Sequence, residues 1–352
     1  MCVLQWDMKI QEGFTFDDVL IRPGASSVEP AEAVLSGRVA GHMLAVPFLS
    51  AAMDRVTGPE MAIALGKVGA LGVLHRNCTI DEQVDMVRMV KVAGVLCAAA
   101  CGPFAIDRAR ALETAGCDII SIDCAHGHNL NVIASAQKIK KSLKKAKLIF
   151  GNIATKEAAK AVCSFADAVK VGVGPGSICT TRMVSGVGVP QLTAIMETVS
   201  VAQKKKVPVI ADGGIRTSGD IAKALAAGAS AVMLGNLFAG TDEAPGEMIE
   251  QEGIRYKEYR GMGSKAVIES ISGSERYLTK GRKAVAEGVE ALVPYKGAVG
   301  EIVAELVSGV QVAMGYVGAK SLQEFSRKAE FIRITGAAHT EGKPHSLAAI
   351  LR

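Results

Sequence analysis

The feature that most constrains the fold of this chain is a regular alternation of short apolar runs with longer amphipathic stretches between residues 47 and 238. The runs are continuously apolar, which indicates strands buried on both faces and therefore a parallel sheet. The eight runs are 47–52, 70–74, 95–100, 118–122, 148–152, 169–173, 208–211 and 231–234. The helical patterns between them are 60–67, 80–92, 105–115, 130–143, 156–165, 191–204 and 218–227.

Eight strands that are each followed by a helix or a longer excursion favour a closed (β/α)8 TIM barrel over an open, doubly wound sheet. Glycines stand where a helix end favours a left-handed residue, at Gly69, Gly94, Gly116 and Gly228. The residues suited to cap helix N-termini are Thr79, Thr155 and Ser218. Strand, helix and turn signals therefore all predict the same α/β fold.

The regular pattern ends after the eighth run. Residues 240–293 are rich in glycine and charge and show little periodicity, so we expect an irregular insertion over about 240–296. An insertion of this length within a compact domain is usually functional. Helical patterns resume at 299–314 and 322–329. We therefore expect residues 1–352 to form one catalytic barrel domain with a long flap after strand eight.

Composition excludes several classes of protein. The net charge is only +5, and the one dense basic run, 138–147, has no aromatic residue for base stacking, which favours a solvated helix face over a nucleic-acid site. The eight cysteines form no CxxC pair, so neither a zinc site nor a disulfide scaffold is expected. The sequence shows neither a signal peptide nor a long apolar span. We expect a cytoplasmic protein without membrane or specific nucleic-acid partners.

The end of the sixth predicted strand carries the strongest chemical signal. Glycines at 172, 174 and 176 allow backbone groups to approach a ligand closely. Ser177 adds a hydroxyl suited to a phosphate, and Cys179 follows among polar residues in a loop rather than in an apolar run. Active sites of TIM barrels lie at the C-terminal ends of the strands. Cys179 is therefore a candidate nucleophile, because dipoles and cations there would favour the thiolate.

The loops after the last two strands, Asp212-Gly213-Gly214 and Gly235-Asn236, lie where such barrels bind phosphate on backbone amides. His126 and His128 near Asp123 suggest a metal site only weakly, because no further ligand follows at metal-site spacing.

Three strings together are highly specific: GVGPGSICTTR at 172–182, ADGGI at 211–215 and YRGMGS at 259–264. With them, the chain resembles the IMP dehydrogenase/GMP reductase family over nearly its whole length. The resemblance implies a homotetrameric barrel that binds IMP and NAD, in which Cys179 attacks the purine C2. It implies a substrate site formed by Met53, Ser177, Asp212, Gly214, Gly235, Asn236, Tyr259, Gly261, Met262, Gly263 and Glu287. It places the cofactor against Asp123, Asn152, Gly172 and Gly174.

The two activities of the family differ in the second half of the reaction. Dehydrogenases hydrolyse a covalent intermediate with the help of an Arg-Tyr pair in a flap, which Arg276 and Tyr277 resemble, together with Thr181. The resemblance therefore implies NAD-dependent oxidation of IMP to XMP, a step of guanine nucleotide biosynthesis. GMP reductase is the alternative within the family, and a non-catalytic nucleotide-binding barrel is the alternative of another class.

The family also binds a monovalent cation, usually K⁺. By resemblance, the carbonyls of Gly174, Gly176 and Cys179 would supply one side of this metal site, and Glu341, Gly342 and Lys343 of a neighbouring subunit the other. Most relatives insert a paired CBS regulatory module after the second barrel helix, whereas residues 90–94 here lead straight into the third predicted strand. We therefore expect no CBS module. Cys124 after Asp123 is a further departure, which could change NAD affinity.

Overall fold

The computed structural model describes residues 10–269 and 285–346. Its core is a closed barrel of eight parallel strands in the order β4 to β11, with β11 pairing back onto β4, so the predicted TIM barrel is confirmed. The strands are β4 (Phe48–Ser50), β5 (Leu71–Leu74), β6 (Ala98–Cys101), β7 (Ile119–Ile122), β8 (Lys147–Ile153), β9 (Ala168–Val171), β10 (Val209–Asp212) and β11 (Ala231–Leu234). Each overlaps one predicted run.

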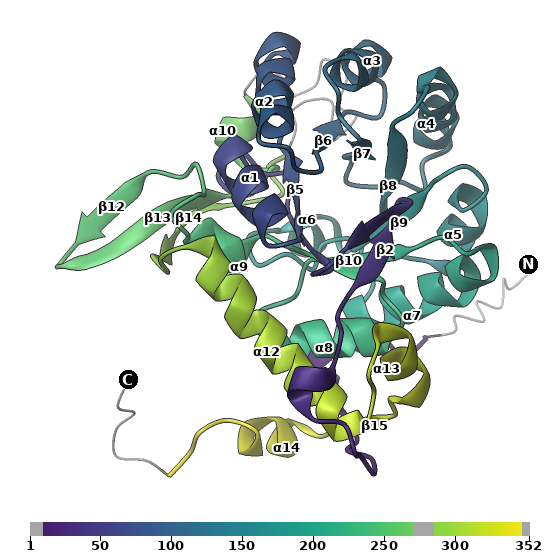
Figure 1. Ribbon diagram of the computed structural model, residues 1–352, viewed down its shortest axis with the longest axis vertical. Coiled ribbons are helices and arrows are strands. Elements are labelled where there is room, and N and C mark those ends of the chain that lie inside the picture. The colour runs from purple at the N-terminus through teal and green to yellow at the C-terminus, as the bar shows by residue number, and fades with distance from the viewer. Residues whose placement is uncertain (1–9, 270–284, 347–352) are drawn as a thin grey trace, which may run out of the picture.

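Helices surround the barrel, as Figure 1 shows. They are α1 (Pro59–Lys67), α2 (Ile80–Val92), α3 (Ile106–Thr114), α4 (Leu130–Ser142), α5 (Lys156–Val162), α7 (Gln191–Ala202), α8 (Ser218–Ala226) and α12 (Val299–Val317). Thr79 and Thr155 cap α2 and α5 as predicted. The prediction for Ser218 is wrong: it is the first residue of α8, and the hydroxyl of Thr217 accepts from the Asp220 amide at 3.2 Å as the cap.

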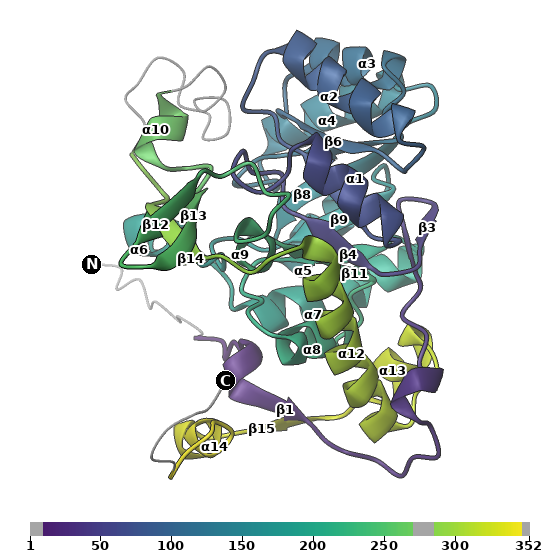
Figure 2. The ribbon, with the colours of Figure 1, turned by 60° about the vertical axis from the view of Figure 1, so that its left-hand side comes forward.

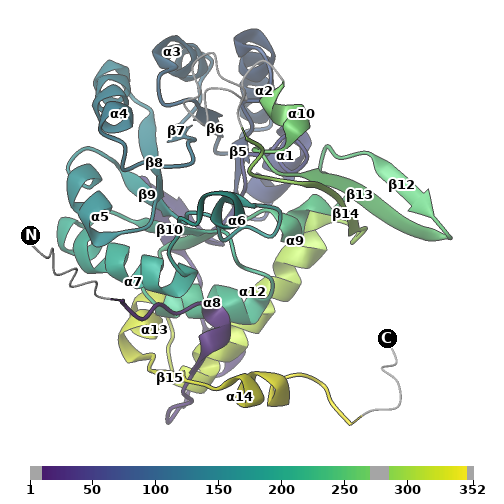
Figure 3. The ribbon, with the colours of Figure 1, turned by 180° about the vertical axis from the view of Figure 1, so that it is seen from behind.

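Two apolar clusters share the barrel wall. Residues that point outward pack against the helices, whereas alternate residues such as Leu49, Ile149 and Ile210 fill the barrel interior. A hairpin of β2 (Gly37–Val39) and β3 (His42–Leu44) adds Val39 and Leu44 to the interior cluster. In Figure 1, β2 lies in front of the barrel strands, whereas Figure 3 shows the opposite end with α6 (Thr181–Ser185) in front. The hairpin therefore closes one end of the barrel and leaves the other for the site.

The insertion after β11 is more regular than predicted. The short helix α9 (Asn236–Ala239) leads into an antiparallel sheet of β12 (Met248–Gln251), β13 (Ile254–Arg260) and β14 (Glu290–Pro294), with α10 (Lys265–Ile268) between the last two strands. This sheet projects from the side of the barrel in Figure 2. The expectation of an irregular segment is therefore wrong for its described residues. β12 and β14 are largely exposed, and β13 is buried only at Lys257 and Tyr259, so these strands lack the continuous apolar runs that identified the barrel strands.

Shorter elements complete the described fold. They are η1 (Phe16–Asp18), β1 (Val19–Ile21), η2 (Pro30–Glu32), η3 (Gln203–Lys205), α13 (Leu322–Lys328), β15 (Phe331–Arg333) and α14 (Gly336–Glu341). An N-terminal and a C-terminal segment meet where β1 pairs antiparallel with β15. In the described ranges, every helix is too short or too polar to cross a membrane.

Candidate active site

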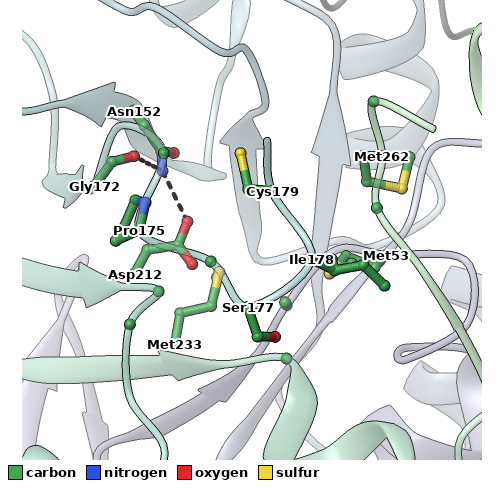
Figure 4. Close-up of a pocket in the computed structure, with 18 of the residues that line it drawn as sticks. Met53, Asn152, Gly172, Pro175, Ser177, Ile178, Cys179, Asp212, Met233 and Met262 are labelled. Atoms are coloured by element: carbon green, nitrogen blue, oxygen red, sulfur yellow. Dashed lines mark hydrogen bonds between the residues drawn. The ribbon is translucent and has the colours of Figure 1, made fainter. Parts of the chain in front are cut away.

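A cavity opens at the C-terminal ends of the barrel strands, where Figure 4 shows Ser177 and Cys179 of the loop after β9 close to Asp212 at the end of β10. Most of the predicted site residues line it. From the predicted substrate site these are Met53, Ser177, Asp212, Gly214, Gly235, Asn236, Tyr259, Gly261, Met262, Gly263 and Glu287. From the other predicted sets they are Cys179, Thr181, Asp123, Asn152, Gly172, Gly174 and Gly176. One cavity thus brings together residues from 53 to 287.

Close backbone contact explains the glycines of the loops after β9 and β10. A Cβ on Gly172, whose φ is +148°, would lie 2.0 Å from the carbonyl oxygen of Asp212. A Cβ on Gly213, with φ of +93°, would lie 2.9 Å from Pro175. Any side chain at these positions would separate the loops. The glycines therefore hold the Cys179 loop and the Asp212 loop against each other.

The thiol of Cys179 stands at the start of a hydrogen-bonded chain. It is half-buried, and its sulfur donates to the Thr181 hydroxyl at 3.2 Å. That hydroxyl donates in turn to a carboxylate oxygen of Glu287 at 2.7 Å. Hydroxyl groups both accept and donate, so this chain offers the thiol proton a route to a carboxylate.

Backbone pairing positions Glu287 across 106 residues of sequence from Thr181. The amide of Thr180 donates to the Glu287 carbonyl at 3.0 Å, and the amide of Val289 donates to Ile178 at 3.1 Å. On its other side, the Glu287 amide donates to Gly263 at 2.9 Å. The three segments 178–180, 261–263 and 287–289 thus form one hydrogen-bonded layer beside the thiol.

Arg182 holds the cysteine loop in shape. Its guanidinium donates to the carbonyls of Val173, at 3.2 Å, and Val189. Its side chain lies so close to Gly174 and Gly188 that a Cβ on either would approach it to 2.7 or 2.6 Å. Burial lowers the pKa of Arg182, and the nearby thiol acts in the opposite direction. The cation expected near Cys179 is therefore present but bonded to backbone.

Ser177, Gly235 and Tyr259 mark one end of the cavity. The Tyr259 ring is buried, and its hydroxyl lies 3.9 Å from the sulfur of Met53 and within hydrogen-bond reach of Ser177. A Cβ on Gly235 would lie 2.9 Å from this hydroxyl. Burial raises the pKa of Tyr259 to about 12, so the hydroxyl keeps its proton near neutral pH. This end therefore offers two hydroxyls beside the backbone of Gly235 and Asn236.

The opposite end contains Asp123, Asn152 and Gly172. Asp123 is 4% exposed and is paired with the buried guanidinium of Arg76 at 3.2 Å. Asn152 donates to the Gly172 carbonyl at 2.7 Å and to Asp212 at 2.9 Å, as Figure 4 shows. It stands where the pairing of β8 with β9 shifts register. Such a bulge re-aims a side chain, here toward the cavity.

Several lining residues were missed by the sequence analysis. They include Ser121, Lys170, Arg216 and Met233. Lys170 is the most informative, because it is 5% exposed and pairs with Asp212 at 2.7 Å. The signal was available: a lysine within a strand whose other residues are all apolar must either pair or unfold the strand. Arg76, which supports Asp123, could not be assigned a partner from sequence.

Other predicted residues lie away from this cavity. Arg276 and Tyr277 fall outside the described residues. Glu341, Gly342 and Lys343 are exposed, at and after the end of α14, and their predicted role concerns a neighbouring subunit. His126, His128 and Asp123 do not form a metal-ligating cluster; the part of the chain that the structure describes contains no group of three such side chains.

Fold and cavity define the class of this protein: a (β/α)8 barrel whose candidate site lies at the C-terminal mouth around a half-buried cysteine. Within that class, residues 13–345 match the family model described as IMP dehydrogenase / GMP reductase domain. The chain belongs to this family.

Relatives from distant organisms carry one name, inosine-5'-monophosphate dehydrogenase. The protein of Methanocaldococcus jannaschii is 39% identical and that of Halobacterium salinarum 39%, each over 97% of this chain and over 96% and 94% of the relative. The Cryptosporidium parvum protein is 40% identical over 96% of both chains. The first alignment spans 477 positions against the 352 residues here, so at least 125 positions (477 − 352) have no counterpart in this chain.

Proposed function

We propose that this protein is an IMP dehydrogenase, an oxidoreductase that oxidises IMP to XMP with NAD in the cytoplasm, as a step of guanine nucleotide biosynthesis. One observation supports this most strongly. The Cys179 thiol lies in the cavity and donates a hydrogen bond to the Thr181 hydroxyl, which in turn donates to the Glu287 carboxylate. A thiol nucleophile and a proton acceptor are the two groups that addition to a purine C2 requires. The shared name of the relatives points to the same activity.

The substrate is proposed to span the cavity from Tyr259 to Cys179. Its phosphate would accept hydrogen bonds from the Ser177 and Tyr259 hydroxyls and from backbone amides of Gly214, Gly235 and Asn236, which lie at loops suited to anions. Its ribose would meet Asp212, whose carboxylate can accept from two hydroxyls. Met53, Met262 and the backbone of Gly261 and Gly263 would flank the purine beside the thiol.

The thiol then adds to C2 of IMP, its proton passing through Thr181 to Glu287. Hydride leaves C2, and the resulting covalent adduct is hydrolysed by water to release XMP. The sum is IMP, NAD and water giving XMP, NADH and one proton. Arg276, Tyr277 and Thr181 are proposed to activate the water, by the family resemblance. Arginine is a weak base in water, so this role requires a site from which bulk solvent is excluded.

The end of the cavity with Asp123 and Asn152 fits the nicotinamide riboside of NAD. Gly172 and Gly174 line this end, and Asp123 is a carboxylate fixed by Arg76. When bound, NAD supplies the electron-poor ring that accepts the hydride. The residues of this chain would hold that ring beside the substrate and exclude water from the transfer.

A K⁺ ion and a homotetramer belong to the same proposal. The carbonyls of Gly174, Gly176 and Cys179 are hard oxygen donors from one loop, which suits a monovalent cation. The Gly176 carbonyl already accepts from the Cys179 amide at 3.1 Å, so a cation there would also steady the nucleophile. Glu341, Gly342 and Lys343 of an adjacent subunit would complete the site. We also predict that the chain has no CBS module, and therefore that its activity is not regulated through one.

One assay separates this proposal from its alternatives. The protein is mixed with IMP, NAD and K⁺, and NADH is followed by absorbance for the wild type and for Cys179→Ala. We expect turnover in the wild type and none in the variant. Oxidation of NADPH with GMP would instead indicate a GMP reductase, and IMP binding without either reaction would indicate a non-catalytic nucleotide-binding barrel. Replacing K⁺ with Li⁺ should lower turnover.

A further inference from the structure

A buried lysine of β9 lies beneath the ribose end of the candidate site. Lys170 is 5% exposed, although lysine is rarely buried without a partner. Its ammonium bonds Asp212 at 2.7 Å and also donates to the side-chain oxygen of Asn152. Asn152 bonds the same Asp212 oxygen, Oδ2, at 2.9 Å. The three side chains thus form one network whose only cation is Lys170.

The fold makes room for this lysine specifically. Lys170 pairs with Gly151 of β8 on one side and with Ile210 of β10 on the other. A Cβ on Gly151 would lie 2.7 Å from the Cβ of Lys170. Ala168, two residues earlier on the same face, fills the barrel interior, so Lys170 forms the next layer toward the mouth. A bulky neighbour at 151 would displace it.

The two oxygens of the Asp212 carboxylate differ in their hydrogen-bond partners. Oδ2 accepts from both Lys170 and Asn152, whereas no described residue donates to Oδ1. Figure 4 shows one Asp212 oxygen joined to Asn152 and the second pointing away from it. Asp212 is 19% exposed at its side chain, so its remaining acceptor is reachable from the cavity. A carboxylate held at one oxygen presents the other in a fixed direction.

We propose that Lys170 is a positioning residue: it fixes Asp212 so that Oδ1 accepts from the ribose hydroxyls and selects ribonucleotides over deoxyribonucleotides. This rests on the proposed nucleotide function. The lysine touches neither substrate nor thiol; it acts through the carboxylate. A site built to bond hydroxyls rejects an analogue that lacks them, because a buried acceptor is then left unpaired. Without the Lys170 cation, the Asp212 carboxylate would no longer be held in one direction, and the preference for ribonucleotides over deoxyribonucleotides would decrease.

The test compares binding of IMP and of 2′,3′-dideoxy-IMP by calorimetry. The wild type should favour IMP by about tenfold or more, and Lys170→Met by less than about threefold. Lys257→Met is the matched control, since Lys257 is also 5% exposed but bonds only the backbone carbonyls of Thr241, Asp242 and Ala244, outside the cavity. It should lower stability yet keep the wild-type preference.

Two outcomes would overturn the proposal: a wild type that binds both nucleotides equally, or a Lys170→Met variant with the full wild-type preference. If the methionine variant does not fold, Lys170→Gln keeps a neutral donor and should show an intermediate preference; an unchanged preference would again refute the role. Binding is read without turnover. An absence of NADH formation by the wild type would therefore refute the dehydrogenase proposal alone, and the binding ratio would still decide the role of Lys170.

Discussion

Replacing Glu287 with glutamine tests whether its carboxylate receives the thiol proton or only orients Thr181. The variant keeps an oxygen that can accept from the Thr181 hydroxyl, now 2.7 Å away, but it removes the charge. Hydrogen bonds to charged groups contribute about 1.5–3 kcal/mol and neutral ones about 0.5–1.5 kcal/mol, so lost orientation alone costs about 1–1.5 kcal/mol, or about 5- to 13-fold in rate. Proton transfer by a positioned side chain typically contributes about 10²–10⁴-fold.

We expect Glu287→Gln to slow the first turnover by more than that 13-fold limit. The assay is rapid mixing of enzyme with IMP and NAD, with the NADH burst as the measure of adduct formation. Glu290→Gln is the control: Glu290 is exposed, lies on β14 outside the cavity, and accepts only from the Ala266 amide at 3.4 Å. A burst slowed by about 13-fold or less would refute proton acceptance by Glu287, and a burst equal to the wild type would refute the relay itself.

Three further predictions concern the frame of the site. Gly172→Ala should lower the unfolding free energy by about 3 kcal/mol or more in urea denaturation, because its Cβ would meet the Asp212 carbonyl at 2.0 Å; an unchanged midpoint would contradict the loop contact. Arg260→Met should lower the unfolding free energy by about 3 kcal/mol and raise the KM for IMP, because Asp54, which is 7% exposed, would lose its ion-pair partner beside residues 261–263. Unchanged KM and stability would contradict a role for this ion pair in holding that segment. Burial lowers the pKa of His75, so the unfolded chain binds more protons and stability should fall as pH drops below about 6.5; His75→Gln should lessen this fall in denaturation curves, and an identical fall would exclude His75.

The barrel could be predicted from sequence because its strands are buried on both faces. Such strands are continuous apolar runs, and each of the eight predicted runs overlaps an observed strand to within a few residues. The sheet of β12, β13 and β14 escaped prediction for the opposite reason. β12 and β14 are exposed along most of their length, and charged residues are interspersed among the others in β13, so the apolar pattern is interrupted and the segment reads as irregular.

Much of the cavity lining could be predicted from the sequence, but the hydrogen bonds that connect its residues could not. Glycine loops and Cys179 stand out locally, and family resemblance adds residues as remote as Met53 and Glu287. Which side chains bond one another depends on the barrel closing and on the register of segments far apart. The link from Thr181 to Glu287 exists only because residues 287–289 pair with the cysteine loop. The burial of Lys170 is explained only by its ion pair with Asp212, which the sequence does not reveal.

The two hydrogen-bonded networks of the site lie on different kinds of secondary structure, and this difference predicts how each responds to denaturant. Asp212, Lys170 and Asn152 come from neighbouring barrel strands or their ends, so their geometry is as rigid as the barrel itself. Cys179 and Glu287 lie in loops and Thr181 begins the short helix α6, and these segments are joined by a few backbone hydrogen bonds and by the side-chain bond from Thr181 to Glu287. Sites on strands are held more precisely than sites on loops, whose local opening is cheaper. Mild denaturant should therefore abolish the thiol chemistry before it disrupts the network of Asp212, Lys170 and Asn152.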